Sequence, residues 1–192
     1  MNKTTLALTN EQYKDIIETM RTGFETADQK KIRPNHKVAT ALVLEANLGI
    51  RISDIVQLRL TDIVKDGGRY RLDITEQKTK KKRTFTVPNE IYNYIKMYCI
   101  DNEIKSNEVI FPLTERAIQK QLKLVCDHLG YHGVGTHSFR KLFATNVYED
   151  NEHDIVLVQE LLQHSSPMTT KRYIRVSSEK VETALQKNIN LL

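Results

Sequence analysis

The stretch YRLDITEQKTKKKRTFTVP, residues 70–88, marks the one clear change of period in an otherwise helical chain. Its ends, residues 70–75 and 83–88, alternate in character and are rich in β-branched and aromatic residues, as the strands of a hairpin are. The turn signal DGG at residues 66–68 leads into the first strand. The basic run KTKKKR, residues 78–83, lies between the strands, so we expect it to form an exposed hairpin tip.

Helical periodicity flanks this hairpin on both sides. We expect a first helix that opens at Thr9, whose spacing from Gln12 fits a capping box. An apolar helix over residues 36–48 should stop near Gly49, and a shorter one should begin with Ser53 as its N-cap. Later helical patterns lie at about 91–98, 114–129, 137–148, 153–163 and 178–190. The predicted fold is therefore mainly α with a small antiparallel β-sheet, an α+β class.

The chain is moderately basic, and its charges are unevenly distributed. Among 192 residues, 29 are Lys or Arg and 24 are Asp or Glu, which gives a net charge of +5. Basic side chains gather at residues 78–83 and in KRYIR, residues 171–175, whereas acidic ones gather in EDNEHD, residues 149–154. This segregation indicates one face for a polyanion such as DNA and another for solvent or protein.

Composition also limits the class of protein and its compartment. The length fits one large domain or two small ones and allows a full hydrophobic core. No apolar run is long enough to cross a membrane, and the N-terminus lacks the apolar region of a secretory signal. Cys99 and Cys126 lie in apolar patterns without metal-ligand spacing, so we expect buried free thiols in a reducing, cytoplasmic setting.

Two arginine-bearing segments are candidates for phosphate binding. In THSFR, Thr136 is a natural N-cap, and His137 and Arg140 lie three residues apart on one helix face, near the positive helix end. In NLGIRISD, Arg51 stands at the start of a helical pattern. The alternative for Arg51 is a structural role, as a helix-start arginine paired with Asp54.

A tyrosine among basic residues follows the 153–163 helical pattern. His164 ends VQELLQH and precedes a Ser-Ser-Pro break, and Tyr173 comes nine residues later. Alternatively, a tyrosine in such a setting is a surface aromatic or a platform on which a base stacks. A functional interpretation therefore depends on several positions acting together: Arg51, Lys78, His137, Arg140, His164 and Tyr173.

Four segments, taken in order, resemble the sequence boxes of the tyrosine recombinases, or phage integrase family. NLGIRISDIVQLRLTDI is similar to the first arginine box, and DITEQKTKKKRTFTVP to the lysine-bearing hairpin. THSFRKLFATNVYE resembles the His-x-x-Arg box, and LVQELLQHSSPMTTKRYIRV the closing box. The resemblance covers about residues 6–190 and implies the catalytic-domain fold of that family. It departs at Lys141, where the family often has histidine, and at Gln163, where glycine is frequent.

The resemblance also implies a domain organisation. Residues 1–192 would form a single catalytic domain, with an N-terminal helix and linker at 1–34, a catalytic body at 35–176 and a C-terminal helix at 177–192. Family members usually carry a separate DNA-gripping domain before the first box, and residues 1–34 are too short to replace it. We therefore expect either an excised catalytic domain or a compact recombinase like the fimbrial-switch invertases.

By resemblance, Tyr173 is the nucleophile, and Arg51 and Arg140 hold the scissile phosphate. General chemistry supports these roles, because two guanidiniums can clamp phosphate oxygens with paired hydrogen bonds and never lose their charge. A free tyrosine has a pKa of about 10 and is therefore protonated at neutral pH, but nearby cations would favour the phenolate. With two arginines on the phosphate, no metal or cofactor is required.

The resemblance assigns proton transfer to the remaining residues. His137 and His164 bond the phosphate oxygens or move protons, and Lys78 protonates the departing 5′ oxygen. Crowding by neighbouring cations should lower the pKa of Lys78 towards a useful range, although Lys80 and Lys81 are close enough to compete for the role. The expected contacts to the DNA backbone are Lys80, Lys81, Lys82, Arg83, Lys171 and Arg172.

The implied enzyme is a site-specific recombinase that acts on double-stranded DNA through a 3′-phosphotyrosyl bond, without ATP. We expect a monomer without DNA and a homotetramer on paired sites. The C-terminal pattern places apolar residues at Val181, Leu185, Ile189 and Leu192, on a helix that would dock on a neighbour or on its own core.

Three other interpretations compete with the recombinase. A metal-dependent nuclease would use His153 and the carboxylates of residues 149–154, but they lack ligand spacing. A non-catalytic DNA-binding descendant should have lost a catalytic residue, and none is lost. A type IB topoisomerase-like enzyme shares the chemistry, but the short chain and the closing box favour a recombinase.

Overall fold

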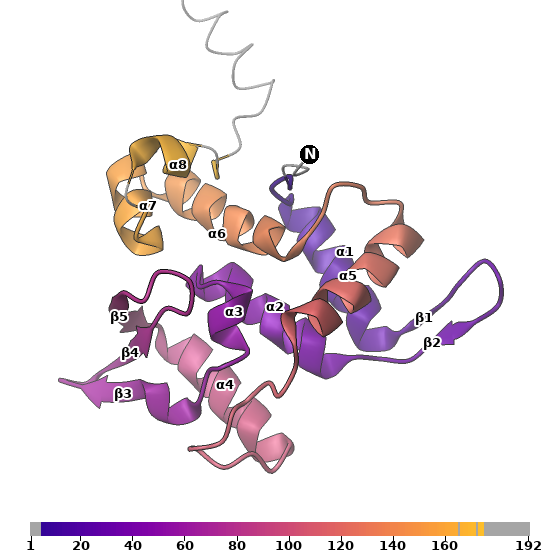
Figure 1. The fold of residues 1–192 in the computed structure, drawn as a ribbon, viewed down its shortest axis with the longest axis horizontal. Coiled ribbons are helices and arrows are strands. Elements are labelled where there is room, and N and C mark those ends of the chain that lie inside the picture. The colour runs from indigo at the N-terminus through magenta and orange to yellow at the C-terminus, as the bar shows by residue number, and fades with distance from the viewer. Residues whose placement is uncertain (1–4, 165, 172, 175–192) are drawn as a thin grey trace, which may run out of the picture.

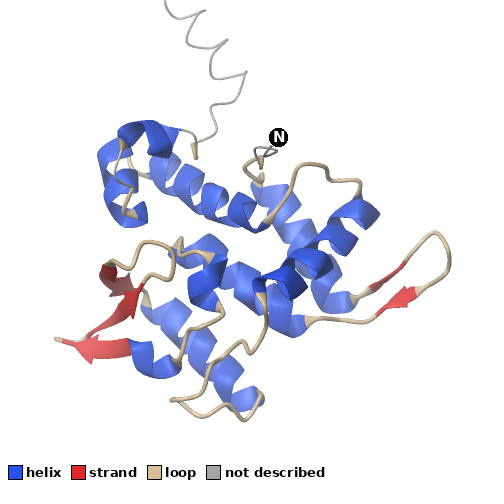
Figure 2. Cartoon of the chain, viewed as in Figure 1, coloured by secondary structure: helices blue, strands red, loops and turns tan. Residues whose placement is uncertain are grey.

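The computed structural model describes residues 5–164, 166–171 and 173–174, in which most of the chain is helical (Figures 1 and 2). The elements in chain order are α1 (Asn10–Thr22), β1 (Phe24–Glu25), β2 (Lys31–Ile32), α2 (His36–Leu48), α3 (Ile52–Ile55), the 3-10 turn η1 (Leu60–Asp62), β3 (Ile63–Asp66), β4 (Arg69–Thr75), β5 (Lys82–Val87), α4 (Asn89–Asp101), α5 (Glu115–Leu129), α6 (Thr136–Asp150), α7 (Ile155–Leu162) and α8 (Pro167–Lys171). The predicted mainly α fold with a small antiparallel sheet is confirmed. Among the described residues, no helix is long and apolar enough to cross a lipid bilayer.

The predicted capping residues of α1 and α2 lie where the sequence places them. The Thr9 side chain accepts from the Gln12 N–H and the Gln12 side chain accepts from the Thr9 N–H, which completes the capping box. α2 starts at an Asn35 cap and ends at Gly49, which is left-handed with φ of 57°. These signals are local, so the sequence alone is enough to predict them.

Two predicted N-caps are wrong. α3 begins one residue before Ser53, with Arg51 in the cap position and no side-chain cap bond. Thr136 is the first residue of α6 rather than its cap, which is Gly135. Because Ser138 occupies the third position of α6, its hydroxyl accepts from the Gly135 N–H and takes over the capping interaction. The pattern at 178–190, with Val181, Leu185, Ile189 and Leu192, lies outside the described residues.

The main sheet is an antiparallel meander in the order β3-β4-β5. Residues 67–68 form the turn between β3 and β4, as the DGG signal predicts, and Leu72 pairs with Phe85 across β4 and β5. The edge strand β3 was not predicted, because three of its four side chains are exposed and no alternation marks it. The two-residue strands β1 and β2 are likewise too short to show a period.

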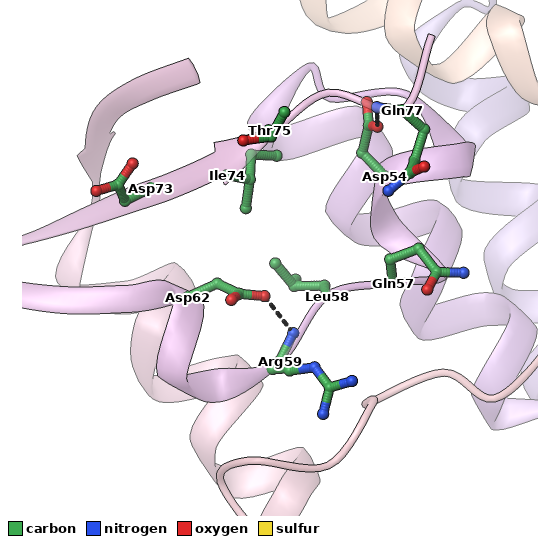
Figure 3. A pocket seen from close by; sticks show the side chains of 9 residues that line it. All are labelled: Asp54, Gln57, Leu58, Arg59, Asp62, Asp73, Ile74, Thr75 and Gln77. Atoms are coloured by element: carbon green, nitrogen blue, oxygen red, sulfur yellow. Dashed lines mark hydrogen bonds between the residues drawn. The ribbon is translucent and has the colours of Figure 1, made fainter. Parts of the chain in front are cut away.

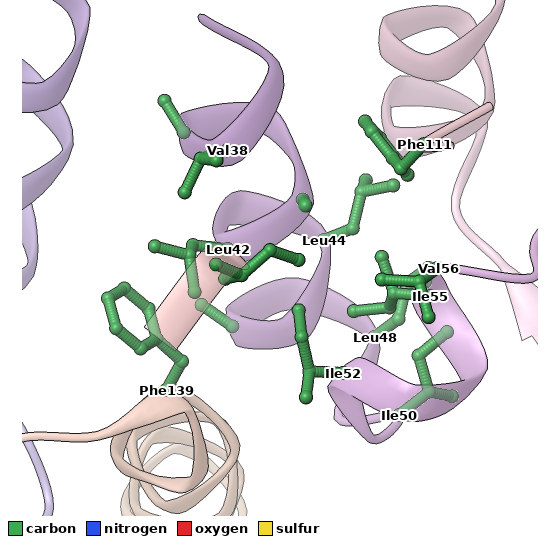
Figure 4. Packing of buried hydrophobic residues seen from close by; sticks show 14 of the residues in the cluster. Val38, Leu42, Leu44, Leu48, Ile50, Ile52, Ile55, Val56, Phe111 and Phe139 are labelled. Atoms are coloured by element: carbon green, nitrogen blue, oxygen red, sulfur yellow. The ribbon is translucent and has the colours of Figure 1, made fainter. Parts of the chain in front are cut away.

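Helix α2 runs through the core and contacts α1, α3 and α6 (Figure 1). It is apolar around most of its circumference, as a helix buried on all sides must be. Figure 4 shows side chains of α2 packed against those of the segment that follows it and against Phe111 and Phe139. Cys99 and Cys126 are buried and free, as the sequence predicts. The rigid α2 therefore presents its C-terminal end, Gly49 to Arg51, at a fixed place.

Gly49 is required at that end for two reasons. Its backbone is left-handed, and a Cβ at this position would collide with the ring of Phe143 on α6. We predict that Gly49→Ala lowers the free energy of unfolding by about 3 kcal/mol, from left-handed strain of about 1–2 kcal/mol together with overpacking. Urea denaturation measures the loss.

Gly67→Ala is the matched control. Gly67 is also left-handed, with φ of 55°, but no described atom lies within 4 Å of the position of its Cβ. Gly67→Ala should therefore lower the free energy of unfolding only by the left-handed strain of the backbone, about 1–2 kcal/mol. Equal losses in the two variants would show that contact with Phe143 does not constrain Gly49.

Candidate active site

The structure gathers the predicted catalytic residues from distant elements around the end of α2. Arg51 directly follows that end, and Lys78 lies in the β4–β5 turn. His137 and Arg140 lie three residues apart in the first two turns of α6, so both project from one face of the helix. The last two, His164 and Tyr173, follow α7 and α8.

Arg51 is held by a carboxylate that was not predicted from the sequence. Its Nη1 lies 2.5 Å from Oε2 of Glu76, and its side chain keeps 13% exposure. Asp54, the partner considered from sequence, instead accepts from the Gln77 N–H at 2.7 Å (Figure 3). Arg51 therefore connects the end of α2 to the hairpin rather than to its own helix.

Arg140 is fully buried, with 0% exposure. Its Nη1 donates to the Gly49 carbonyl at 2.7 Å and its Nη2 to the Leu162 carbonyl at 2.8 Å, while its Nε–H has no partner among the described residues. Burial, then the charges of Arg83 and Arg51, lower its pKa to about 10, against a raising effect of Tyr173. The guanidinium therefore remains charged at neutral pH, and its Nε–H is available to donate a hydrogen bond to a ligand.

The pKa of His137 depends on four nearby cations. Burial lowers its pKa, and the charges of Arg140, Lys78, Arg51 and Lys141 lower it further. These side chains therefore lie within electrostatic range of one imidazole. A neutral His137 at pH 7 can accept a proton or donate one hydrogen bond, depending on its tautomer.

His164 and Tyr173 are in contact. The two rings lie edge to face with centroids 4.6 Å apart, and Nδ1 of His164 lies 3.1 Å from the Thr170 hydroxyl. Burial, then the charges of Arg140, Arg51 and Arg83, lower the pKa of His164 to about 4. The Tyr173 ring also packs on the small cluster around Ala144 and Val158, and Nζ of Lys141 lies 5.7 Å from its centroid.

The predicted DNA-backbone contacts divide into exposed and buried groups. Lys80, Lys81, Lys82 and Lys171 are exposed, and Arg172 lies outside the described residues. The expectation that Arg83 lies on an exposed tip is wrong, since its residue exposure is 1%. Strand β5 begins at Lys82, so Arg83 is already inside the sheet, where alternation turns it towards the core.

Two pockets flank the hairpin, and their linings differ in charge. One, of about 430 Å³, is lined by Lys81 and Lys82 of the hairpin, by α7 and by the residues that follow α7 up to His164, so it opens beside the candidate site. The other, of about 210 Å³, includes Asp54, Asp62 and Asp73 in its lining (Figure 3). Its three carboxylates outnumber its one cation, Arg59, whereas the first pocket has two lysines against Glu160, so a DNA strand is expected on the side of the first pocket.

Two buried carboxyls were not predicted from the sequence. Glu76 continues the face of β4 that carries Leu72 and Ile74, so strand alternation could have placed it inside. Glu45, on α2, is completely buried, and burial raises its pKa well above the usual range despite the nearby charge of Arg140. No local signal reveals Glu45, because its position on a helix buried on all sides is set by tertiary packing.

The acidic segment at 149–154 has structural roles. Asp154 caps α7 by accepting from the N–H groups of Val156 and Leu157. His153 lies 3.4 Å from Glu149 one helical turn away. Within the described parts of the chain, no three His, Cys, Asp or Glu side chains group so that they could hold a metal ion.

Comparisons with known proteins identify the family of this chain. The model of the phage integrase family matches residues 7–180. A probable integrase/recombinase of Bacillus subtilis, YoeC, is 30% identical over 182 residues, which cover 88% of this chain and 95% of YoeC. The tyrosine recombinase XerH of Helicobacter pylori is 25% identical and is covered over 52% of its length, against 95% of this chain. The chain therefore spans nearly all of one relative and about half of the other.

The fold is shared with solved structures. XerH bound to palindromic difH substrate, in a post-cleavage complex, superposes with a TM-score of 0.72 at 24% identity, over 96% of this chain and 53% of that one. The predicted catalytic-domain fold is thereby confirmed.

The lowered pKa of His164 makes stability depend on pH. Between about pH 6.5 and 4 the unfolded chain binds a proton at this histidine that the folded chain does not, so stability falls as the pH falls through that window. We predict that His164→Asn removes about 2–3 kcal/mol of the loss that wild type shows between pH 7.5 and 4.5. Urea denaturation at the two pH values measures it, and an undiminished loss in the variant would contradict it.

Proposed function

The chain belongs to the phage integrase family, and from that premise we propose that it is a tyrosine-type site-specific DNA recombinase. It cleaves and rejoins DNA through a 3′-phosphotyrosyl bond to Tyr173. The observation that carries the proposal is the contact of Tyr173 with His164 beside the buried Arg140. Arg51 and Lys78 of the β4–β5 turn lie near the same place. Comparison of YoeC and XerH with this chain supports the same class of reaction.

The proposed step exchanges one phosphodiester for another. The Tyr173 oxygen attacks phosphorus, the bond to the 5′ oxygen breaks, and a free 5′-hydroxyl leaves. The phenolic proton passes to a neutral imidazole, that of His137 or His164. Burial lowers the pKa of both, so each is unprotonated at neutral pH, and the negative charge of the bound phosphate raises their proton affinity for this step. Lys78 supplies the proton that the departing oxygen takes up. A 5′-hydroxyl from a partner duplex reverses the step, so bond energy is retained.

The two arginines act at different depths. Arg51 is partly exposed and meets the phosphate first, whereas Arg140 lies beneath the end of α7. Because Arg140 has no exposed surface, its contact with a phosphate oxygen requires the α7–α8 segment to shift away from the guanidinium. Before that shift, with the α7–α8 segment covering Arg140, the charge of the guanidinium is already in place and attracts the phosphate without contact.

The assembly and compartment belong to the same proposal. Exposed Lys80, Lys81, Lys82 and Lys171 contact the DNA backbone of a double-stranded site. Four copies assemble on two paired sites, so that each exchanged strand has its own tyrosine, and the chain works in the cytoplasm without a metal or other cofactor. The solved XerH complex, in which that recombinase is bound to its difH substrate after cleavage, supports the DNA partner.

We predict that the protein forms a denaturation-resistant adduct on a nicked suicide duplex of its site, and that Tyr173→Phe forms none. Without the phenolic oxygen no covalent bond to phosphorus can form. Electrophoresis of labelled DNA under denaturing conditions measures the adduct. Tyr148→Phe, in the same small cluster, is the control and should form adducts like wild type. Lack of adduct with bound wild type, or its persistence in Tyr173→Phe, would refute the assignment.

The identity of the proton donor can be tested with a modified substrate. We predict that Lys78→Ala slows cleavage about 100-fold or more, and that a 5′-bridging sulfur restores most of the rate, because a thiolate leaves without a proton. Single-turnover cleavage of the oxygen and sulfur substrates measures both. Lys80→Ala and Lys81→Ala are matched controls in the same turn. Sulfur rescue of one of these, instead of Lys78, would move the role to that lysine.

A further inference from the structure

Arg83 is the most heavily bonded cation of the hairpin, although it faces away from solvent. Its Nη1 lies 3.2 Å from Oε1 of Glu76, and both Nη atoms lie 3.4 Å from the Gly49 carbonyl. Its Nη2 also donates to the Leu161 carbonyl at 2.6 Å. One guanidinium thus joins the hairpin, the end of α2 and the end of α7, which are the three segments that carry Lys78, Arg51 and His164.

Glu76 is shared between two arginines. Its Oε2 accepts from Arg51 at 2.5 Å and from the Thr79 hydroxyl at 2.7 Å, while its Oε1 faces Arg83. Burial alone would raise the pKa of Glu76, but the hydrogen bonds from Thr79 and Arg51 and the charges of Arg51 and Arg83 hold it below its usual value. The carboxylate is therefore ionised at neutral pH.

The charges of this group leave a surplus. Two guanidiniums and one carboxylate carry one net positive charge, Arg140 beside them adds a second, and the nearby Asp54 carboxyl offsets at most one of the two. Without Arg83, the carboxylate would have Arg51 as its one ion-pair partner among the described residues. The pair would then be neutral, and the field of Arg51 at a bound phosphate would be largely cancelled.

We propose that Arg83 is a positioning residue that neutralises Glu76 and thereby leaves the charge of Arg51 available to the scissile phosphate. It does so from inside the fold, without touching DNA. The inference rests on the proposed function, since it concerns the phosphate that Tyr173 attacks. It replaces the expectation from sequence that Arg83 contacts the DNA backbone.

The charge argument is tested by removing the cation and then the anion. Arg83→Met keeps an unbranched apolar chain in the space and removes the charge, while Arg83→Met with Glu76→Gln removes both charges. Single-turnover adduct formation on the suicide duplex is measured at saturating protein, together with the Kd for the duplex and its dependence on salt. Thermal melting confirms that each variant is folded, and Lys82→Met shows the salt effect of losing an exposed lysine.

We expect Arg83→Met to slow adduct formation roughly 100-fold, a loss comparable to that of one preorganised electrostatic group. The Kd and the salt slope should stay as in wild type, whereas Lys82→Met should reduce the slope by about one. Adding Glu76→Gln to Arg83→Met should restore the rate at least tenfold, because the unbalanced carboxylate is gone. A purely packing role for Arg83 predicts no recovery.

Three results would overturn the inference. They are a wild-type rate in Arg83→Met, a double variant as slow as the single one, and a reduced salt slope in Arg83→Met, which would mean direct phosphate contact. If Arg83→Met does not fold, the double variant is compared with Glu76→Gln alone, and more than a tenfold loss between those two would also overturn it. An absence of adduct with wild type itself would instead remove the proposed function and this inference with it.

Discussion

Two guanidinium groups, those of Arg83 and Arg140, are buried where two helices end, and the site is arranged around the acceptors that they need. An arginine cannot shed its charge on burial, so each one must find hydrogen-bond acceptors inside the protein. The last carbonyls of a helix lack partners in their own helix and carry the negative end of its dipole. Gly49 at the end of α2 and Leu161 and Leu162 at the end of α7 provide such carbonyls.

This arrangement explains why residues from distant parts of the sequence meet at one place. The Gly49 carbonyl accepts from both arginines, so β5 and α6 are joined to the end of α2 through a single backbone atom. The left-handed turn at Gly49 aims that carbonyl and lets Phe143 pack beside it. The next residues lead to Arg51, whose partner Glu76 closes the hairpin through backbone bonds with Lys80 and Lys81. The hairpin and the α7–α8 segment are thus fastened to the same rigid helix end.

The sequence allows prediction of what is local or periodic. The Thr9 cap, the end of α2 at Gly49 and the β4–β5 hairpin follow from signals within a few residues. The six candidate catalytic residues could be selected because their spacing resembles a family. The partners of the arginines could not be selected in this way, since they include backbone carbonyls distant in sequence, to which any residue type could contribute.

Two patterns in the sequence indicate opposite positions for Arg83. It shares the buried face of β5 with Val87, and the two-residue period of a strand places it inside. The basic run around it favoured the opposite interpretation, because five cations in six residues are typical of a solvated tip. Glu76, on the inward face of the neighbouring strand, distinguishes a buried Arg83 from an exposed one, because a buried cation needs a nearby anion.

The same group of cations governs the histidines. His137 and His164 are kept neutral by burial and by the charges of Arg140 and Arg51, so neither one adds to the positive charge before a substrate arrives. A phosphate bound among these cations would oppose their field and raise the proton affinity of both imidazoles. The histidines can therefore take up the phenolic proton when the phosphate is in place, and much less readily when it is not. In the proposed reaction, binding of the substrate thus creates the proton acceptor that its cleavage requires.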